Sequence, residues 1–149
     1  MATRQEKYPE TRTFHYYNAN PKGRLTGDCV TRAICMALGK SYETVYRELL
    51  EMCLKTGYSL ASAECYSRYL ETQGWKKMKQ PRKFDNTKYT GKEWCEKVQD
   101  DIDWTENGKQ LEQIVAHIGG NHIVAIIDGK VYDTWDSTDG CIGNYWIKE

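Results

Sequence analysis

The sequence predicts an α+β fold in which helices come first and an antiparallel sheet follows. Apolar residues recur at helical spacing between residues 28 and 74, whereas the last third of the chain carries β-branched runs separated by turn signals. The chain has 149 residues, of which 40% are hydrophobic and 28% charged, and no linker-like stretch divides it. We therefore expect one domain over residues 1–149, with residues 1–17 as a peripheral N-terminal segment.

Local signals set the ends of the expected helices. Each of the first three ends at a glycine, and serines stand where the second and third need capping residues. The expected helices span residues 28 or 29 to 39, 41 to 57, 59 or 62 to 74, and 90 to 98. On the second helix, the residues expected to face the core are Tyr42, Val45, Tyr46, Leu49, Leu50 and Cys53.

The expected sheet is built around a β-hairpin. Residues 122–127 and 130–135 flank Asp128-Gly129, which is the strongest short hairpin signal. Residues 111–118 have helical spacing but also read as a strand before Gly119-Gly120. We favour a strand that pairs with 122–127, because an isolated hairpin is only marginally stable. Residues 140–146 are expected to form a final strand.

Cys29 stands where the first helix begins. Gly27 allows a sharp turn into the helix, and Asp28 is expected to cap the first amides. The unpaired N–H groups and the positive end of the helix dipole stabilise a thiolate and lower the pKa of a cysteine from about 8.5. The alternative is a cysteine that only fills the core.

A thiolate nucleophile needs a base beside it, and the chain has three histidines, His15, His117 and His122. Only His122 lies at the open end of the predicted hairpin, where a carboxylate on the returning strand can hold the imidazole. We therefore choose His122 as the base. His117 is interpreted as a surface or turn-facing residue.

The hairpin register decides which aspartate faces His122. A two-residue loop places His122 opposite Trp135 and puts Asp133 on the histidine face of the hairpin. A one-residue bulge at Gly129 would bring Asp136 round instead. The spacing alone leaves both aspartates open.

The order of these motifs resembles the papain-like cysteine peptidases, over roughly residues 18–146. Asn121-His122-Ile123-Val124-Ala125 is similar to the family's Asn-His-x-Val-Ala pattern, and Asp136-Ser137 to its Asn-Ser pair. The segments around Cys29 and Val131 also resemble small uncharacterised papain-like proteins of bacteria and phages. The resemblance implies N-terminal helices, with the nucleophile at a helix N-terminus, packed on a C-terminal antiparallel sheet. It also implies Asp136 as the third triad member, with Asp133 as the alternative.

The chain departs from the family at the oxyanion donor. Gly23 stands where classical members have a glutamine, six residues before the nucleophile. Asn18 and Asn20 are the nearest upstream amides, and Asn20 is our candidate donor together with the backbone N–H of Cys29. The Cys-Gly-Ser-Cys-Trp segment of classical members is also absent, which argues against close kinship to the secreted ones.

The resemblance implies a cysteine-nucleophile hydrolase. It would cleave a peptide, isopeptide or related amide bond of a protein or peptide substrate through Cys29, His122 and Asp136, with an acyl-enzyme and no cofactor. The first alternative is a catalytically inactive papain-like protein-binding module. Asp-Cys at a helix start also occurs in cell-wall peptidases of the NlpC/P60 type, which a cytoplasmic location disfavours.

Composition indicates the compartment and the excluded partners. The polar N-terminus lacks the apolar stretch of a signal peptide, and no run is long enough to span a membrane, so we expect a cytoplasmic protein with no membrane partner. The six cysteines are interpreted as free thiols, and their spacing does not favour a metal site. The basic segment 75–92, with interleaved aromatics, makes nucleic-acid binding the least favoured alternative.

Overall fold

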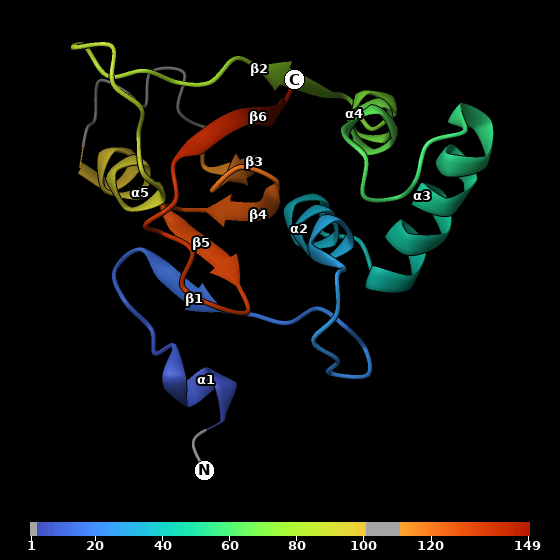
Figure 1. The fold of residues 1–149 in the computed structure, drawn as a ribbon, viewed down its shortest axis with the longest axis horizontal. Helices are drawn as coiled ribbons and strands as arrows, with labels where there is room; N and C mark the ends of the chain where they lie inside the picture. The colour runs from blue at the N-terminus through green and yellow to red at the C-terminus, as the bar shows by residue number, and fades with distance from the viewer. Residues whose placement is uncertain (1–2, 101–110) are drawn as a thin grey trace.

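The computed structural model describes residues 3–100 and 111–149, which form one mixed sheet with helices on both faces (Figure 1). The α+β class predicted from the sequence is confirmed. The described elements in chain order are α1 (Arg4–Lys7), β1 (Phe14–Tyr16), α2 (Cys29–Leu38), α3 (Tyr42–Thr56), α4 (Ala63–Thr72), β2 (Trp75–Met78), α5 (Gly91–Asp100), β3 (Gln113–Ile118), β4 (His122–Ile127), β5 (Lys130–Asp133) and β6 (Ile142–Lys148).

The sheet is mixed and is not formed by the C-terminal strands alone. Its strand order is β1-β5-β4-β3-β6-β2, and β1 pairs with β5 in parallel while the other pairs are antiparallel. The N-terminal strand β1 forms one edge of the sheet and contributes the fully buried Phe14 to the interior. Three and four residues in β1 and β2 are too few for a clear alternation in the sequence.

The β4–β5 hairpin has the register predicted for a two-residue loop. Ile127 pairs with Lys130 and Ala125 with Tyr132. Asp128 and Gly129 both have positive φ, 51° and 75°, as the loop of a type I′ hairpin requires. No bulge shifts the pairing, so the alternative register does not occur. The neighbouring segment 113–118 is a strand paired with β4 along its whole length, which confirms the strand interpretation.

The helix ends follow the local signals. Helix α2 begins at Cys29 and ends at Leu38, and the next residue, Gly39, is its C-terminal cap with φ 67°. The Ser41 hydroxyl accepts a hydrogen bond from the backbone N–H of Thr44 and so caps the start of α3, and Gly57 caps its end after Thr56. Within the described residues, no helix has the length and apolarity needed to cross a membrane.

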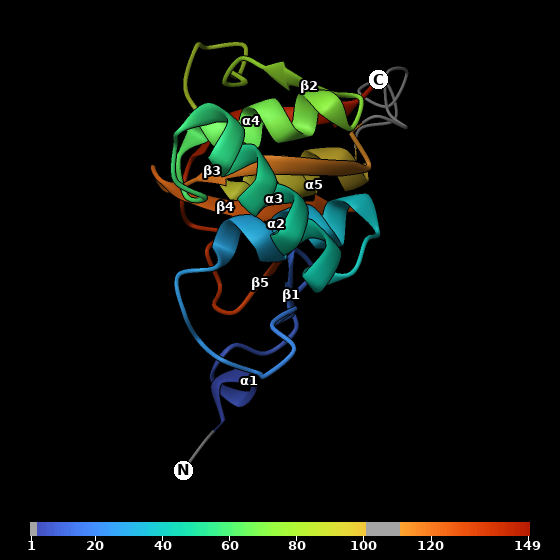
Figure 2. The same cartoon turned by 90° about the vertical axis from the view of Figure 1, so that its right-hand side faces the viewer.

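Helices cover the two faces of the sheet unequally. Helices α2, α3 and α4 lie on one side and α5 on the other, and α3 is the outermost helix (Figures 1 and 2). Of the residues expected to face the core from α3, Val45 and Leu49 are buried, but Tyr46 and Leu50 are 40% and 43% exposed. That part of the core prediction is wrong, because α3 packs on other helices along a narrow stripe. Helix α2 packs directly on β4, which brings Cys29 close to His122.

Candidate functional site

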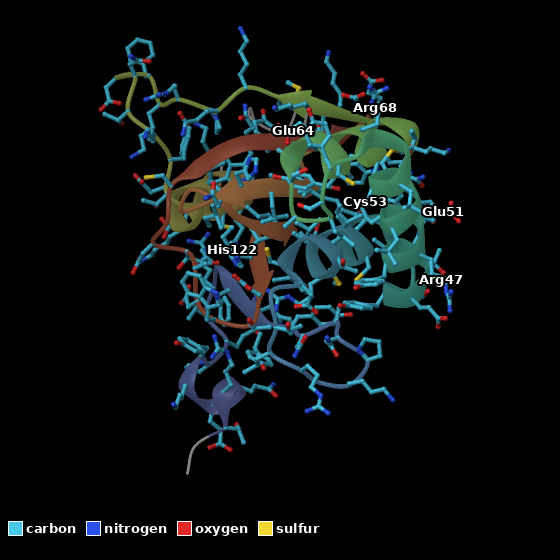
Figure 3. The ribbon with its side chains drawn as sticks, turned by 45° about the vertical axis from the view of Figure 1, so that its right-hand side comes forward. Arg47, Glu51, Cys53, Glu64, Arg68 and His122 are labelled. Carbon is cyan, nitrogen blue, oxygen red and sulfur yellow. The ribbon has the colours of Figure 1, made fainter. Side chains whose placement is uncertain are left out.

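Cys29 and His122 line the same open cavity, at the end of the sheet where α2 and β4 begin. The cavity has a volume of about 270 Å³. Figure 3 labels His122, which lies well apart from Arg47 and Glu51 on the outer helix α3. The other lining residues are Arg4, Leu25, Thr26, Gly27, Arg32, Thr134 and Trp135.

The half-buried thiol of Cys29 lies at the first residue of α2. Burial raises its pKa, but the His122 imidazole, the backbone N–H of Ile123 and the Arg32 charge together outweigh burial and lower the pKa below its ordinary value. The start of a helix favours the thiolate further. The site therefore stabilises the nucleophilic form of this cysteine.

The His122 imidazole is held from the side opposite the thiol. Its Nε2 lies 2.7 Å from Oδ2 of Asp133, which makes Nδ1 the ring nitrogen available to Cys29. Burial lowers the pKa of His122, but Asp133 and Cys29 raise it more strongly, to about 9. The ring also packs against Trp135, with 5.3 Å between ring centroids. These contacts shift the balance toward an imidazolium beside a thiolate.

The carboxylate of Asp133 is fixed from several directions. It is 2% exposed, and its Oδ2 accepts the hydroxyl of Ser137 at 2.7 Å in addition to the imidazole. Its Oδ1 accepts the backbone N–H of Thr134 at 2.7 Å and lies 3.8 Å from Nη2 of Arg32. A carboxylate held in this way keeps the imidazole in one orientation and tautomer.

Asp136, which the resemblance implied as the partner of His122, lies elsewhere. Its Oδ1 accepts the backbone N–H and the hydroxyl of Thr138. It lines a separate cavity together with Arg12 and Lys92. The reason is the two-residue hairpin loop, which has no bulge and therefore leaves Asp133 on the histidine side. The structure thus pairs His122 with Asp133, the alternative that the register had left open.

Asn20, the candidate oxyanion donor, does not face the cavity of Cys29. Its Nδ2 donates to Oδ2 of Asp28 at 3.1 Å, and it lines a different cavity that also includes Tyr42. The side chain of Asp28 caps no helical amide, contrary to expectation. Its carboxylate instead accepts the Tyr42 hydroxyl at 2.8 Å and lies 3.2 Å from Nη1 of Arg32.

The interpretation of His117 as a surface or turn-facing residue is wrong. Its Nε2 lies 2.5 Å from the hydroxyl of Tyr66, and its ring packs on Trp146 with 5.2 Å between centroids. Burial lowers the pKa of this imidazole. Tyr66 comes from α4, 51 residues earlier in the chain, so the sequence around His117 carried no signal of this contact.

Two arginines of the site, Arg4 and Arg32, were not predicted from the sequence. Arg4 lines the cavity, and its Nε donates to the backbone oxygen of Thr134 at 2.6 Å. Arg32 also lines the cavity, and its largely buried side chain lies between Asp28 and Asp133. Its spacing of four residues from Asp28 was a usable signal for one of these two contacts, since such pairs are neighbours on a helix.

In the described part of the chain, no three histidine, cysteine, aspartate or glutamate side chains gather in a way that could hold a metal ion. All six cysteines are free thiols, and Cys53 and Cys65 lie closest, with 3.2 Å between their sulfurs. Comparison with protein-family models, curated proteins and solved structures found no match to this chain.

Proposed function

We propose that this protein is a papain-like cysteine hydrolase that cleaves a peptide, isopeptide or related amide bond of a protein or peptide substrate. The observation that carries the proposal is that Cys29 and His122 line one open cavity, with the imidazole Nε2 of His122 on the buried carboxylate of Asp133. This is the order of groups that activates a thiol for attack on a carbonyl carbon.

The first step is acylation of the thiol. The thiolate of Cys29 forms a bond to the carbonyl carbon, and the electron pair of the C=O bond moves onto the oxygen. The backbone N–H of Cys29, at the start of α2, donates to that oxyanion. When the C–N bond breaks, the imidazolium of His122 gives its proton to the leaving amine.

The second step is hydrolysis of the resulting thioester. His122 takes a proton from water as the water oxygen bonds to the acyl carbon. The C–S bond then breaks, which releases the acid and restores the thiolate beside an imidazolium. Asp133 stays ionised throughout and stabilises the imidazolium at each stage.

The residues that line the cavity favour a substrate that is partly apolar. Leu25 and Trp135 line the cavity and are 54% and 38% exposed, so an acyl or amine side chain can cover them. Arg4 adds a cation at the same cavity. These features fit an extended peptide segment, whose backbone and side chains present carbonyl, apolar and charged groups together.

The proposal is tested by the pH dependence of iodoacetamide labelling, located at each of the six cysteines by mass spectrometry. We expect Cys29 to label fastest below pH 7 and to slow by at least about tenfold in His122→Ala, because the imidazole stabilises the thiolate. Cys141 is the internal reference, since it is the exposed cysteine of the chain. Labelling of Cys29 no faster than Cys141 would contradict the proposal.

One observation favours a second candidate, a papain-like binding module without turnover. The family's glutamine is replaced by Gly23, and the amide of Asn20, our candidate in its place, donates to Asp28 and not toward the cavity of Cys29. A p-nitrophenyl ester separates the two candidates, because its good leaving group needs little oxyanion stabilisation. A hydrolase would release p-nitrophenol continuously, whereas a module with a reactive thiol would stop after one equivalent.

A further inference from the structure

Arg32 lies at the wall of the proposed active-site cavity and belongs to a buried charge network. Its side chain is 10% exposed. Arg32 follows Cys29 by three residues, so the two side chains lie on neighbouring positions of one face of α2. A guanidinium buried to this extent is strongly unfavourable without anionic partners. The identity of those partners indicates what the residue does.

The Arg32 guanidinium contacts two buried carboxylates that come from distant parts of the chain. Its Nη1 lies 3.2 Å from Oδ1 of Asp28, which precedes the nucleophile helix. Its Nη2 lies 3.8 Å from Oδ1 of Asp133, which holds His122. Asp28 and Asp133 are 7% and 2% exposed, so solvent screens neither contact strongly.

The two oxygens of Asp133 have separate partners. Oδ2 receives the imidazole of His122 and the hydroxyl of Ser137, while Oδ1 receives the backbone N–H of Thr134 and faces Arg32. If the guanidinium were absent, the carboxylate could turn about its Cβ–Cγ bond with less cost. The direction of the bond to His122 would then be less well fixed.

Asp28 anchors the other end of Arg32. Its Oδ2 accepts hydrogen bonds from Asn20 and Tyr42. Its Oδ1 is buried and has no hydrogen-bond donor among the described residues, so the charge of Arg32 is what compensates this oxygen. The network therefore runs from α3 through the start of α2 to the end of β5.

We propose that Arg32 is a positioning residue for the Cys29–His122 pair. By contacting Asp28 and Asp133 together, it fixes the carboxylate that holds His122 relative to the start of α2. The role deepens the proposed function and rests on it. An arginine suits this role because its planar group can face two carboxylates at once, whereas a lysine offers one point charge. The charge of Arg32 also lowers the pKa of the thiol.

The test compares Asp28→Asn with Asp28→Asn/Arg32→Met. Removing Arg32 alone would leave Asp28 buried and uncompensated and could unfold the protein, so the Asp28→Asn background removes that charge first. We expect both variants to unfold at similar temperatures. In the double variant, the pH profile of Cys29 labelling by iodoacetamide should move up by about one pH unit, with labelling at pH 6 about tenfold slower.

Two further variants make the comparison specific. Arg47→Met removes an arginine with the same four-residue spacing to its acid, Glu43, but this pair on α3 is 73% and 70% exposed (Figure 3 labels Arg47). Its labelling profile should match the wild type. Arg32→Lys keeps a charge near Asp28 but cannot face both carboxylates, so it should label more slowly than the wild type even if the double variant does not fold.

The possible outcomes separate the two proposals. Identical profiles for Asp28→Asn and its double variant, or a wild-type profile in Arg32→Lys, would overturn the positioning role while Cys29 remained fast in the wild type. Slow labelling of Cys29 in the wild type would instead remove the proposed function, and the positioning role with it.

Discussion

At the scale of single residues, the site depends on which aspartate holds the imidazole. Asp133 and Asp136 lie three residues apart, and the resemblance to papain-like proteins favoured the second. The structure places the first on His122 and gives the second a local role with Thr138. This difference is useful, because the two residues form a matched pair for substitution.

We expect Asp133→Asn to lower kcat/KM by about 10–100-fold, because the neutral amide removes the charge that raises the pKa of His122 and stabilises its imidazolium. Asp136→Asn should change kcat/KM by less than about threefold, a small effect because no contact links it to His122. Both are measured on the fastest peptide or ester substrate found. A larger loss in Asp136→Asn than in Asp133→Asn would show that the register of the hairpin differs in solution.

The pH dependence should differ between alkylation and hydrolysis. The pKa of Cys29 is lowered and that of His122 is raised to about 9, so the two shifts together favour the thiolate–imidazolium pair below about pH 9. Hydrolysis of an amide should rise as the thiol deprotonates and fall near pH 9 as the imidazolium loses the proton that the leaving amine needs.

Alkylation requires only the thiolate, so its rate should rise through the same acid limb and stay high above pH 9. The two profiles are measured on the same preparation with iodoacetamide and an amide substrate. A fall of both rates near pH 9 would point to unfolding, and far-ultraviolet circular dichroism at each pH checks for it.

At the scale of elements, the hairpin loop determines the position of the aspartates. Gly129 has φ 75°, and a Cβ at this position would meet Cγ of Gln99 at 2.6 Å and the backbone oxygen of Cys95 at 3.0 Å. The loop of β4–β5 is therefore packed against α5. Glycine is needed here for two reasons, its left-handed conformation and its lack of a side chain.

Gly129→Ala should accordingly lower the free energy of unfolding by about 2–4 kcal/mol, from the left-handed strain and the clash together. Gly57→Ala is the matched control, because Gly57 also has a positive φ, 78°, but no atom within 4 Å of the added Cβ. It should cost only about 1–2 kcal/mol. Urea unfolding of the two variants gives both values, and equal losses would mean that the contact with α5 is loose.

The sequence was informative where local chemistry decides the structure. Ser41 and Gly57 marked the ends of α3, and Asp128-Gly129 marked the hairpin, because capping and turn formation involve residues close together in the chain. The positions of Cys29 at the start of α2 and of His122 at the start of β4 were predicted from the same local signals.

Contacts between distant segments could not be predicted in this way. The choice between Asp133 and Asp136 depended on whether the loop held a bulge, and Asp128-Gly129 marked the hairpin without excluding a bulge at Gly129. The contact of Arg32 with Asp133 joins residues about 100 positions apart. The exposure of Leu50 depended on how α3 packs against other helices.

At the scale of the whole molecule, the N-terminal part of the chain contacts the end of β5, where Asp133 lies. Strand β1 pairs in parallel with β5, which ends at Asp133, and Tyr16 is the register partner of that aspartate. Farther back, Arg4 bonds to the backbone of Thr134. Residues expected to be peripheral thus support the strand that carries the partner of His122.

This arrangement makes the two phenylalanines of the chain a direct test of the fold. Phe14 on β1 is fully buried, whereas Phe84 is fully exposed. Phe14→Ala should lower the free energy of unfolding by about 3–5 kcal/mol, through lost burial and the cavity left behind. Phe84→Ala should change it by less than about 0.5 kcal/mol, as surface substitutions usually do.

The same pair of variants links the sheet edge to the site. If β1 supports the end of β5, Cys29 of Phe14→Ala should label more slowly at pH 6 even under conditions where the variant remains folded, because Asp133 then holds His122 less firmly. Phe84→Ala should label like the wild type. A Phe14→Ala variant that loses stability but keeps its labelling profile would mean that β5 holds Asp133 without help from the N-terminal strand.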